Sequence, residues 1–196
     1  MTKNMEYPGK TKVTYDGSQR ETLDMGTNNL LIEVVFKTGA GAAKGVLASK
    51  LAQSGYELAI SPAGGVGLSL QSNGAKASAT STVKVNDGQW HHVLAEADRA
   101  AGKLAIYVDG KAAGEVQLDR IAKDAPLSNT ADFSVGKDFA GAMDFLRVCR
   151  STLVESKTSI DELYAWEFNG PFLRDFTGKA PANGQRDAGA LQRAPQ

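Results

Sequence analysis

The chain has only two histidines, His91 and His92, and such a pair can bind a metal or move protons near neutral pH. Adjacent residues of a strand point to opposite faces of the sheet, so both rings cannot easily hold one ion. The sequence has no His-Glu-x-x-His spacing and a single cysteine to complete a zinc site. We therefore favour structural roles, with one ring toward the interior and the other toward solvent.

Acid pairs come next, because glycoside cleavage needs two carboxyl groups at a fixed separation across the scissile bond. The nearest approach to such a pair on one strand is Glu96 and Asp98, beside the turn-forming residues 99–102. We interpret this pair as the solvated end of a hairpin. The sequence also lacks a Gly-x-Ser-x-Gly nucleophile motif and a glycine-rich phosphate loop. It therefore predicts no catalytic residue and no bound organic cofactor.

The two tryptophans, Trp90 and Trp166, could stack on sugar rings, since an indole offers a broad apolar face. Trp90 opens a strand-like run and we interpret it as a core anchor. We expect Trp166 to pack near the phenylalanine-rich residues that follow it. Cys149, the only cysteine, excludes an internal disulfide and is interpreted as a small buried hydrophobe. The ligand-binding residues thus remain unknown from sequence.

Strands must position these residues, and the run 103–109 predicts one clearly. Leu104, Ile106 and Val108 fall on one face of a period-two pattern, with Ala105 and Tyr107 on the other. Asp-Gly and Asn-Gly dipeptides favour tight turns, because glycine accepts a positive φ. Three such dipeptides predict hairpin turns at residues 73–74, 87–88 and 109–110.

The same pattern predicts strands throughout the region from about Lys12 to Cys149, without a long helical period between them. The predicted strands are 13–15, 30–37, 45–50, 56–60, 66–70, 77–85, 90–93, 103–109, 115–118, 133–136 and 142–148. This spacing is typical of an all-β, two-sheet antiparallel β-sandwich of the jelly-roll type. One short C-terminal helix is predicted from Ile160, Leu163 and Tyr164, with Ser159 as its N-cap and Glu162 completing a capping box.

Length and composition narrow the class of protein. A chain of 196 residues suits one β-sandwich domain, and its 22 basic and 22 acidic residues leave no net charge to attract nucleic acid. No apolar run is long enough for a membrane helix. The N-terminal residues 1–7 show no apolar signal region. The sequence is then either that of a cytoplasmic protein or that of a mature or excised piece with an added Met.

Several sequence blocks resemble bacterial laminin G-like domains of the concanavalin A-like lectin and glucanase jelly rolls, relatives of laminin G and pentraxin modules. The blocks that carry this resemblance most specifically are Asp87-Gly88-Gln89-Trp90-His91-His92-Val93 and Tyr107-Val108-Asp109-Gly110-Lys111. The likeness extends from Lys12 to Tyr164. It implies a module that binds or displays, often on glycans, and seldom catalyses. A fold alone does not fix a function.

The resemblance also bears on a metal, because family members often hold a structural Ca²⁺ at the sandwich rim. Asp144 is predicted to share a strand face with Leu146 and Val148, where a bare carboxylate would be unfavourable. It should therefore cap backbone N–H groups or bind Ca²⁺, with Asp16 of the first turn as a possible second ligand. Both alternatives stay open, and no other cofactor is expected.

We predict a non-catalytic binding module for carbohydrate or cell-surface glycan, in a secreted, periplasmic or envelope-associated bacterial protein. A glycan-cleaving enzyme on the same scaffold is one alternative, and a structural or adhesive domain with a protein partner is another. The predicted sandwich domain spans residues 1–166. Residues 167–196 form an extension expected to pack on it and to end loosely. We expect a monomer without a transmembrane segment that binds no nucleic acid.

Overall fold

The fold is seen in a computed structural model, which describes residues 23–39 and 44–154 and the backbone of residues 162–167. Within these residues it holds eleven strands and no α-helix. The strands are β1 Leu30–Thr38, β2 Gly45–Leu51, β3 Gly55–Ile60, β4 Gly65–Ser72, β5 Ala75–Lys84, β6 Trp90–Asp98, β7 Lys103–Val108, β8 Lys111–Gln117, β9 Ser134–Val135, β10 Gly141–Cys149 and β11 Glu162–Glu167. The described residues include no helix that is both long and apolar enough to span a membrane.

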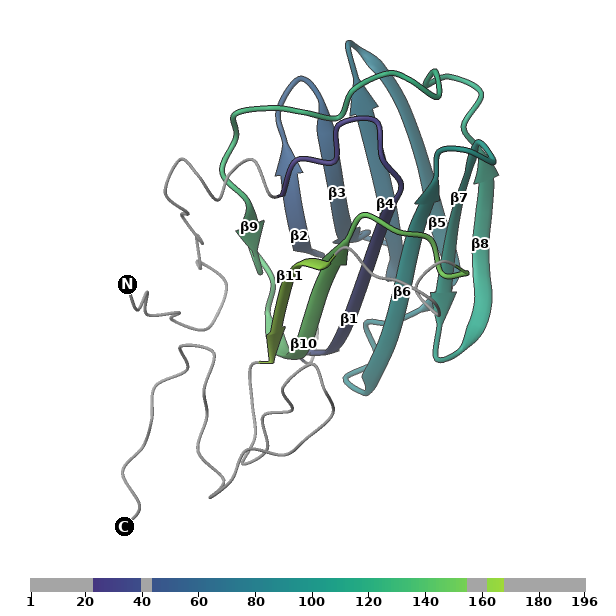
Figure 1. The fold of residues 1–196 in the computed structure, drawn as a ribbon. Coiled ribbons are helices and arrows are strands. Elements are labelled where there is room, and N and C mark those ends of the chain that lie inside the picture. The colour runs from purple at the N-terminus through teal and green to yellow at the C-terminus, as the bar shows by residue number, and fades with distance from the viewer. Residues whose placement is uncertain (1–22, 40–43, 155–161, 168–196) are drawn as a thin grey trace.

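The strands form two antiparallel sheets that pack face to face (Figure 1). One sheet has six strands in the order β11-β10-β1-β6-β7-β8, and the other has five in the order β5-β4-β3-β2-β9. The predicted two-sheet antiparallel sandwich is therefore confirmed. Strand β1 lies inside the six-stranded sheet, paired with β10 on one side and β6 on the other.

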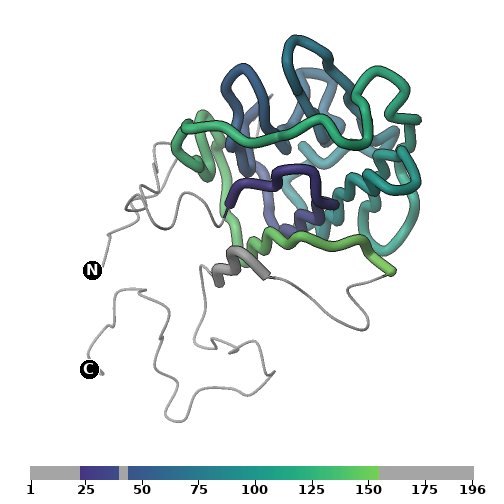
Figure 2. Tube along the Cα trace, turned by 45° about the horizontal axis from the view of Figure 1, so that its top comes forward, coloured from purple at the N-terminus to yellow at the C-terminus, as the bar shows by residue number. Residues whose placement is uncertain are grey.

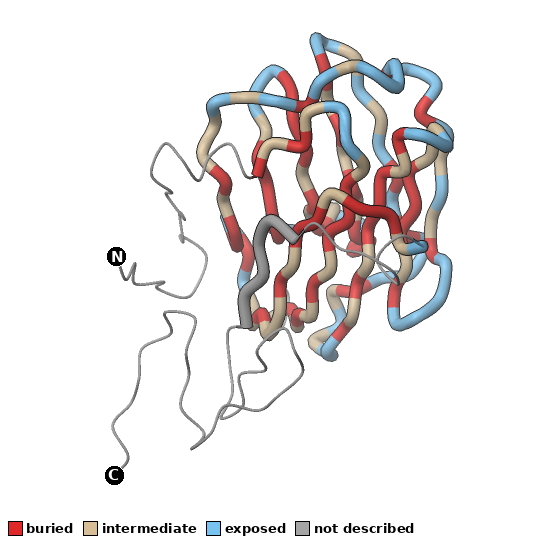
Figure 3. Tube along the Cα trace, in the orientation of Figure 1, coloured by how far each residue is buried: buried red, intermediate tan, exposed pale blue. Residues whose placement is uncertain are grey.

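The core lies between the two sheets, where alternate residues of each strand meet (Figure 3). In β7, Leu104, Ile106 and Val108 are buried while Tyr107 is half-exposed, as the period-two pattern predicts. In β1 the inward row includes Ile32, Val34 and Phe36. The residues of β1 and β6 that lie between these inward residues therefore form the outer face of the six-stranded sheet. Cys149 is buried and forms no disulfide, as expected.

Two of the three predicted hairpins are present. Asn73-Gly74 joins β4 to β5 with φ values of 49° and 86°, and Asp109-Gly110 joins β7 to β8 with 51° and 77°. Two successive positive φ values suit the right-handed twist of the flanking strands. The third prediction is wrong, because Asp87-Gly88 carries the chain from β5 in one sheet to β6 in the other. There the Gly88 N–H donates to Thr38 Oγ1 at 3.2 Å.

The longest described connection runs from Leu118 to Phe133 across one end of the sandwich (Figure 2). It leads from β8, at one edge of the six-stranded sheet, to β9, at an edge of the five-stranded sheet. The edge strands β5 and β8 of the two sheets approach each other so closely that a Cβ at Gly114 would lie 2.5 Å from Thr80 O. Glycine at this position therefore lets the two sheet edges touch.

The predicted C-terminal helix is wrong in the part that the structure describes. Glu162–Glu167 forms β11, which pairs antiparallel with β10. A short apolar run fits helical and strand periods alike, and the free edge of β10 supplies hydrogen bonds that favour the strand. The predicted strand 13–15, Asp16, the helix cap Ser159 and the extension beyond residue 167 lie outside the described residues.

Candidate functional site

The two histidines lie on opposite faces of the six-stranded sheet, as predicted. His91 pairs in register with the inward-facing Phe36, and their ring centroids are 6.5 Å apart. His92 pairs with Val35 in the outward row and is half-exposed. The two rings therefore belong to two separate hydrogen-bonded groups, one at the end of the core and one on the outer face.

His91 is held between two carboxylates. Its Nδ1 lies 2.8 Å from Asp109 Oδ2 and its Nε2 lies 3.0 Å from Asp87 Oδ1. Burial opposes a charge on the ring, but the hydrogen bonds to Asp109 and Asp87 outweigh it and raise the pKa of His91. With both nitrogens engaged, the His91 ring ties the connection between the sheets to the β7–β8 turn. It leaves no nitrogen free for a metal.

This arrangement predicts a loss of stability in mild alkali. Groups whose pKa is raised on folding stabilise the protein below their unfolded pKa, about 6.5 for histidine, and lose that contribution as pH rises through the folded pKa. We expect the free energy of unfolding from urea titrations to fall as the pH rises above about 6.5, and to fall less in His91→Gln. Equal pH dependence in wild type and variant would contradict the role given to His91.

The second group lies on the outer face and joins three strands. The Glu33 carboxylate on β1 is 2.8 Å from His92 Nε2 on β6 and also contacts the Arg147 guanidinium on β10. Burial tends to raise the pKa of Glu33, but the bond to His92 and the charge of Arg147 lower it overall. The hydrogen bond to Glu33 raises the pKa of His92. The result is a connected row of charged groups across the centre of the sheet.

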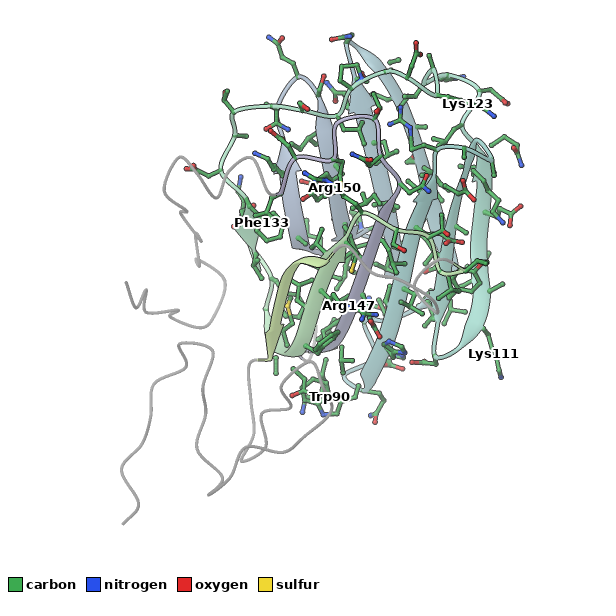
Figure 4. All side chains as sticks on the ribbon, in the orientation of Figure 1. Trp90, Lys111, Lys123, Phe133, Arg147 and Arg150 are labelled. Carbon is green, nitrogen blue, oxygen red and sulfur yellow. The ribbon has the colours of Figure 1, made fainter. Side chains whose placement is uncertain are left out.

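Trp90 lies on the same outer face, at the end where β6 begins (Figure 4). The prediction that it anchors the core is wrong, because 47% of its surface is exposed. His91 takes the inward place opposite Phe36, so its neighbour Trp90 must point outward. Lys37, its register partner on β1, holds its ammonium 5.3 Å from the centre of the ring. This cation–π contact helps to fix the indole in place.

We call this surface the Trp90 face. It consists of Trp90, Lys37, His92, Glu33 and Arg147. An exposed aromatic plane lies beside fixed donors and acceptors, which is an arrangement that can hold a flat polar ligand. Sequence reasoning missed three of these residues because their proximity depends on the pairing of β1 with β6 and β10. For Trp166, only its backbone position in β11 is described.

Glu96 and Asp98 do not form a free acid pair. Glu96 is only 6% exposed, so its interpretation as a solvated hairpin end is wrong. Its Oε2 accepts the Leu153 N–H at 2.8 Å, and its Oε1 accepts the Tyr107 hydroxyl at 3.3 Å. Asp98 caps the following turn by accepting the Ala101 N–H at 2.7 Å. Both carboxylates thus have structural partners.

Asp144 does not take its predicted place in the inward row. The pairing of β10 with β1 shifts between Phe145 and Met143, so Asp144 is the extra residue of a β-bulge. Met143 is buried in the core cluster in its stead, and Asp144 is half-buried. Burial raises the pKa of Asp144.

The Ca²⁺ site expected from Asp144 and Asp16 stays a prediction, since Asp16 lies outside the described residues. Among residues 23–39 and 44–154, no group of three or more His, Cys, Asp or Glu side chains could hold a metal. The Asp144 carboxylate also has no hydrogen bond or ion pair with another described residue. A Ca²⁺ ion there would need Asp16 or backbone carbonyls to reach its usual six to eight oxygen ligands.

The half-buried place of Asp144 in the bulge predicts the melting temperature of Asp144→Asn in EDTA at pH 7. A half-buried carboxylate with a raised pKa disfavours the folded state when it is ionised. We therefore expect the variant to melt no lower than the wild type by calorimetry. A variant that melts several degrees lower in EDTA would show a stabilising partner. A melting temperature that Ca²⁺ raises only in the wild type would establish the calcium site.

Solved structures of other proteins share the fold of this chain. Among curated proteins, none matches the chain by sequence. Among solved structures, the CBM40 of the Ruminococcus gnavus IT-sialidase has a TM-score of 0.55 and 18% identity, covering 68% of this chain and 82% of that chain. A Bacteroides ovatus protein whose proposed role is carbohydrate binding has a TM-score of 0.58 and 16% identity, covering 87% of this chain and 53% of its own.

Domains LG4–5 of mouse laminin α1 superpose with a TM-score of 0.53 and 15% identity, covering 69% of this chain and 40% of that chain. At such low identities these likenesses show a shared fold. The sequence match shows the family, because residues 13–157 fit the family described as the concanavalin A-like lectin/glucanases superfamily. The chain therefore belongs to the concanavalin A-like lectin/glucanase superfamily, as its laminin G-like motifs indicate.

Proposed function

We propose that the chain is a non-catalytic glycan-binding module and that the Trp90 face is its sugar platform. The observation that carries this proposal is the exposed Trp90 ring, 47% of whose surface is open, on the outer face of the sheet. Large aromatic side chains are normally buried in a sandwich of this size, so an exposed indole suggests a ligand. Lys37, placed over its ring, keeps it oriented.

The chemistry of the face suits a sugar ring. The indole would cover the apolar C–H side of a pyranose, since both surfaces are flat and weakly hydrated. His92, Glu33 and Arg147 lie further along the same face and offer donors and acceptors for hydroxyl groups. Because they already hold each other in place, little side-chain entropy would be lost on binding.

Two further observations support a binding role over catalysis. The glycan-binding class fits the structural relatives, one of which is a sialidase CBM40 solved with α2,3-sialyllactose. The acid pair nearest to a glycosidase pattern, Glu96 and Asp98, is engaged in structural hydrogen bonds. We also propose that the protein meets glycans outside the cytoplasm, secreted or at the cell envelope, and that it does so as a monomer.

A glycan array followed by titration calorimetry tests this proposal. We expect Trp90→Ala to weaken binding of array-selected glycans about tenfold, or about 1.4 kcal/mol. Trp90→Phe should keep most of the affinity, because it keeps an aromatic plane. Val83→Ala is the control, since Val83 is also an exposed hydrophobe but lies on β5 of the other sheet. Undiminished binding by Trp90→Ala would overturn the assignment of the site.

A further inference from the structure

A second candidate site lies away from the Trp90 face, in a groove between the edges of the two sheets. The groove has a volume of about 380 Å³ and runs between β5 and the end of β8. Its floor is formed by Ala77 and Val116, which pack against the core. This volume is at the lower end for small-molecule sites and suits one or two sugar rings.

The groove lies where the edges of β5 and β8 separate from each other. The two edges touch at Gly114, and Thr82 Oγ1 donates to Ala113 O at 3.1 Å. Further along, Ala77 faces the groove with a small side chain, and the chain leaves β8 at Leu118, whose N–H donates to Gly102 O at 2.8 Å. The edges therefore separate from each other beyond Gly114.

Five polar side chains line the groove, and they are Lys76, Ser78, Gln117, Asp119 and Arg120. Within the described part of the chain, none of them makes a side-chain hydrogen bond or ion pair with another residue. This differs from the polar groups of the Trp90 face, which are bonded to one another. Polar side chains that line one groove and have no protein partner are available to a ligand.

The charges of the groove indicate the class of ligand. Lys76 comes from one sheet and Arg120 from the segment that follows the other, so two cations flank an opening with one anion, Asp119. A guanidinium binds a carboxylate through two parallel hydrogen bonds. Ser78 and Gln117 add a hydroxyl and an amide, which can bond to sugar hydroxyls.

We propose that this groove binds a carboxylated sugar residue, with Arg120 and Lys76 on the carboxylate. Asp119 accepts a hydrogen bond from a hydroxyl of the same sugar, and Ala77 and Val116 lie under the apolar side of the sugar. This inference rests on the proposed function only in taking the ligand to be a saccharide. The groove would let the module hold an acidic branch of a glycan independently of the Trp90 face.

Titration of the ¹⁵N-labelled chain with galacturonic acid and with N-acetylneuraminic acid tests this inference, each against its methyl ester. We expect at least one free acid to shift the amides of residues 76–78 and 116–120, and its ester to bind at least fivefold more weakly. Arg120→Gln and Lys76→Gln should each reduce affinity by a similar factor. Added salt should weaken binding as well.

Lys84→Gln and Lys111→Gln are matched controls, because these exposed lysines lie at the other ends of β5 and β8. They should bind like the wild type. The groove proposal is overturned if neither acid shifts these amides, if the esters bind equally well, or if Arg120→Gln binds like the wild type. Trp90→Ala should leave this titration unchanged. A failure of the proposed function of the Trp90 face, tested with neutral glycans, would therefore be seen separately from a failure of the groove proposal.

Discussion

Replacing Lys50 with methionine should lower the free energy of unfolding by about 3 kcal/mol, since it removes one member of a buried charged group. Lys50 is only 1% exposed although it belongs to β2. Its ammonium donates to Ala131 O at 2.8 Å and to Asn129 O at 3.1 Å, and lies 3.5 Å from Asp24 Oδ1. Methionine fills nearly the same space but removes the ammonium from the oxygens of Asn129 and Ala131.

The effect should be large because Lys50 joins distant parts of the chain. Asn129 also donates from its side-chain amide to Lys50 O, and its own N–H donates to Asp24 Oδ1. The group thus ties the long connection after β8 to β2 and to the segment before β1.

Urea unfolding followed by circular dichroism measures this loss. Lys84→Met is the control, because Lys84 is an exposed lysine in the other half of the same sheet. It should change stability by less than about 0.5 kcal/mol. If Lys50→Met were as stable as this control, the ammonium would contribute nothing to the fold.

Gly55→Ala should destabilise the protein by a comparable amount, about 3 kcal/mol or more. Gly55 has a φ of 130°, which side chains disfavour, and an added Cβ would lie 2.0 Å from Lys50 O and 2.6 Å from Asn129 Nδ2. The backbone oxygen cannot move aside without breaking the pairing of Leu51 with Gly55. The substitution therefore combines backbone strain with a clash.

Gly74→Ala separates these two contributions. Gly74 also has a positive φ, 86°, but nothing lies within 4 Å of the position of its Cβ. This variant should lose only about 1 kcal/mol, the conformational part alone. Thermal unfolding of both variants side by side gives the comparison. Equal losses would mean that the contact with Lys50 O is relieved at little cost.

The strands and the sandwich could be predicted from the sequence because their signals are local. Alternation such as that of Leu104, Ile106 and Val108 depends on one strand and one buried face. The Asn73-Gly74 and Asp109-Gly110 turns likewise depend on two residues each. Residues 162–164 were too few for their period to separate a strand from a helix.

The site depends on partners far away in the chain, and there prediction failed. Glu96 is buried because the segment containing Leu153 crosses over it. Trp90 is exposed because its neighbour His91 takes the inward place. Asp144 leaves the inward row through a bulge that no local pattern indicates. Each outcome follows from tertiary pairing, which a single strand does not encode.

The Trp90 indole resonance gives the most direct test of the glycan-binding proposal. An array-selected neutral glycan is added to the ¹⁵N-labelled chain, with Trp90→Phe used to assign the indole signal. We predict that this signal shifts together with the amides of Lys37 and His92, with the same dissociation constant as in calorimetry. A glycan that binds while these three signals stay in place would contradict the account.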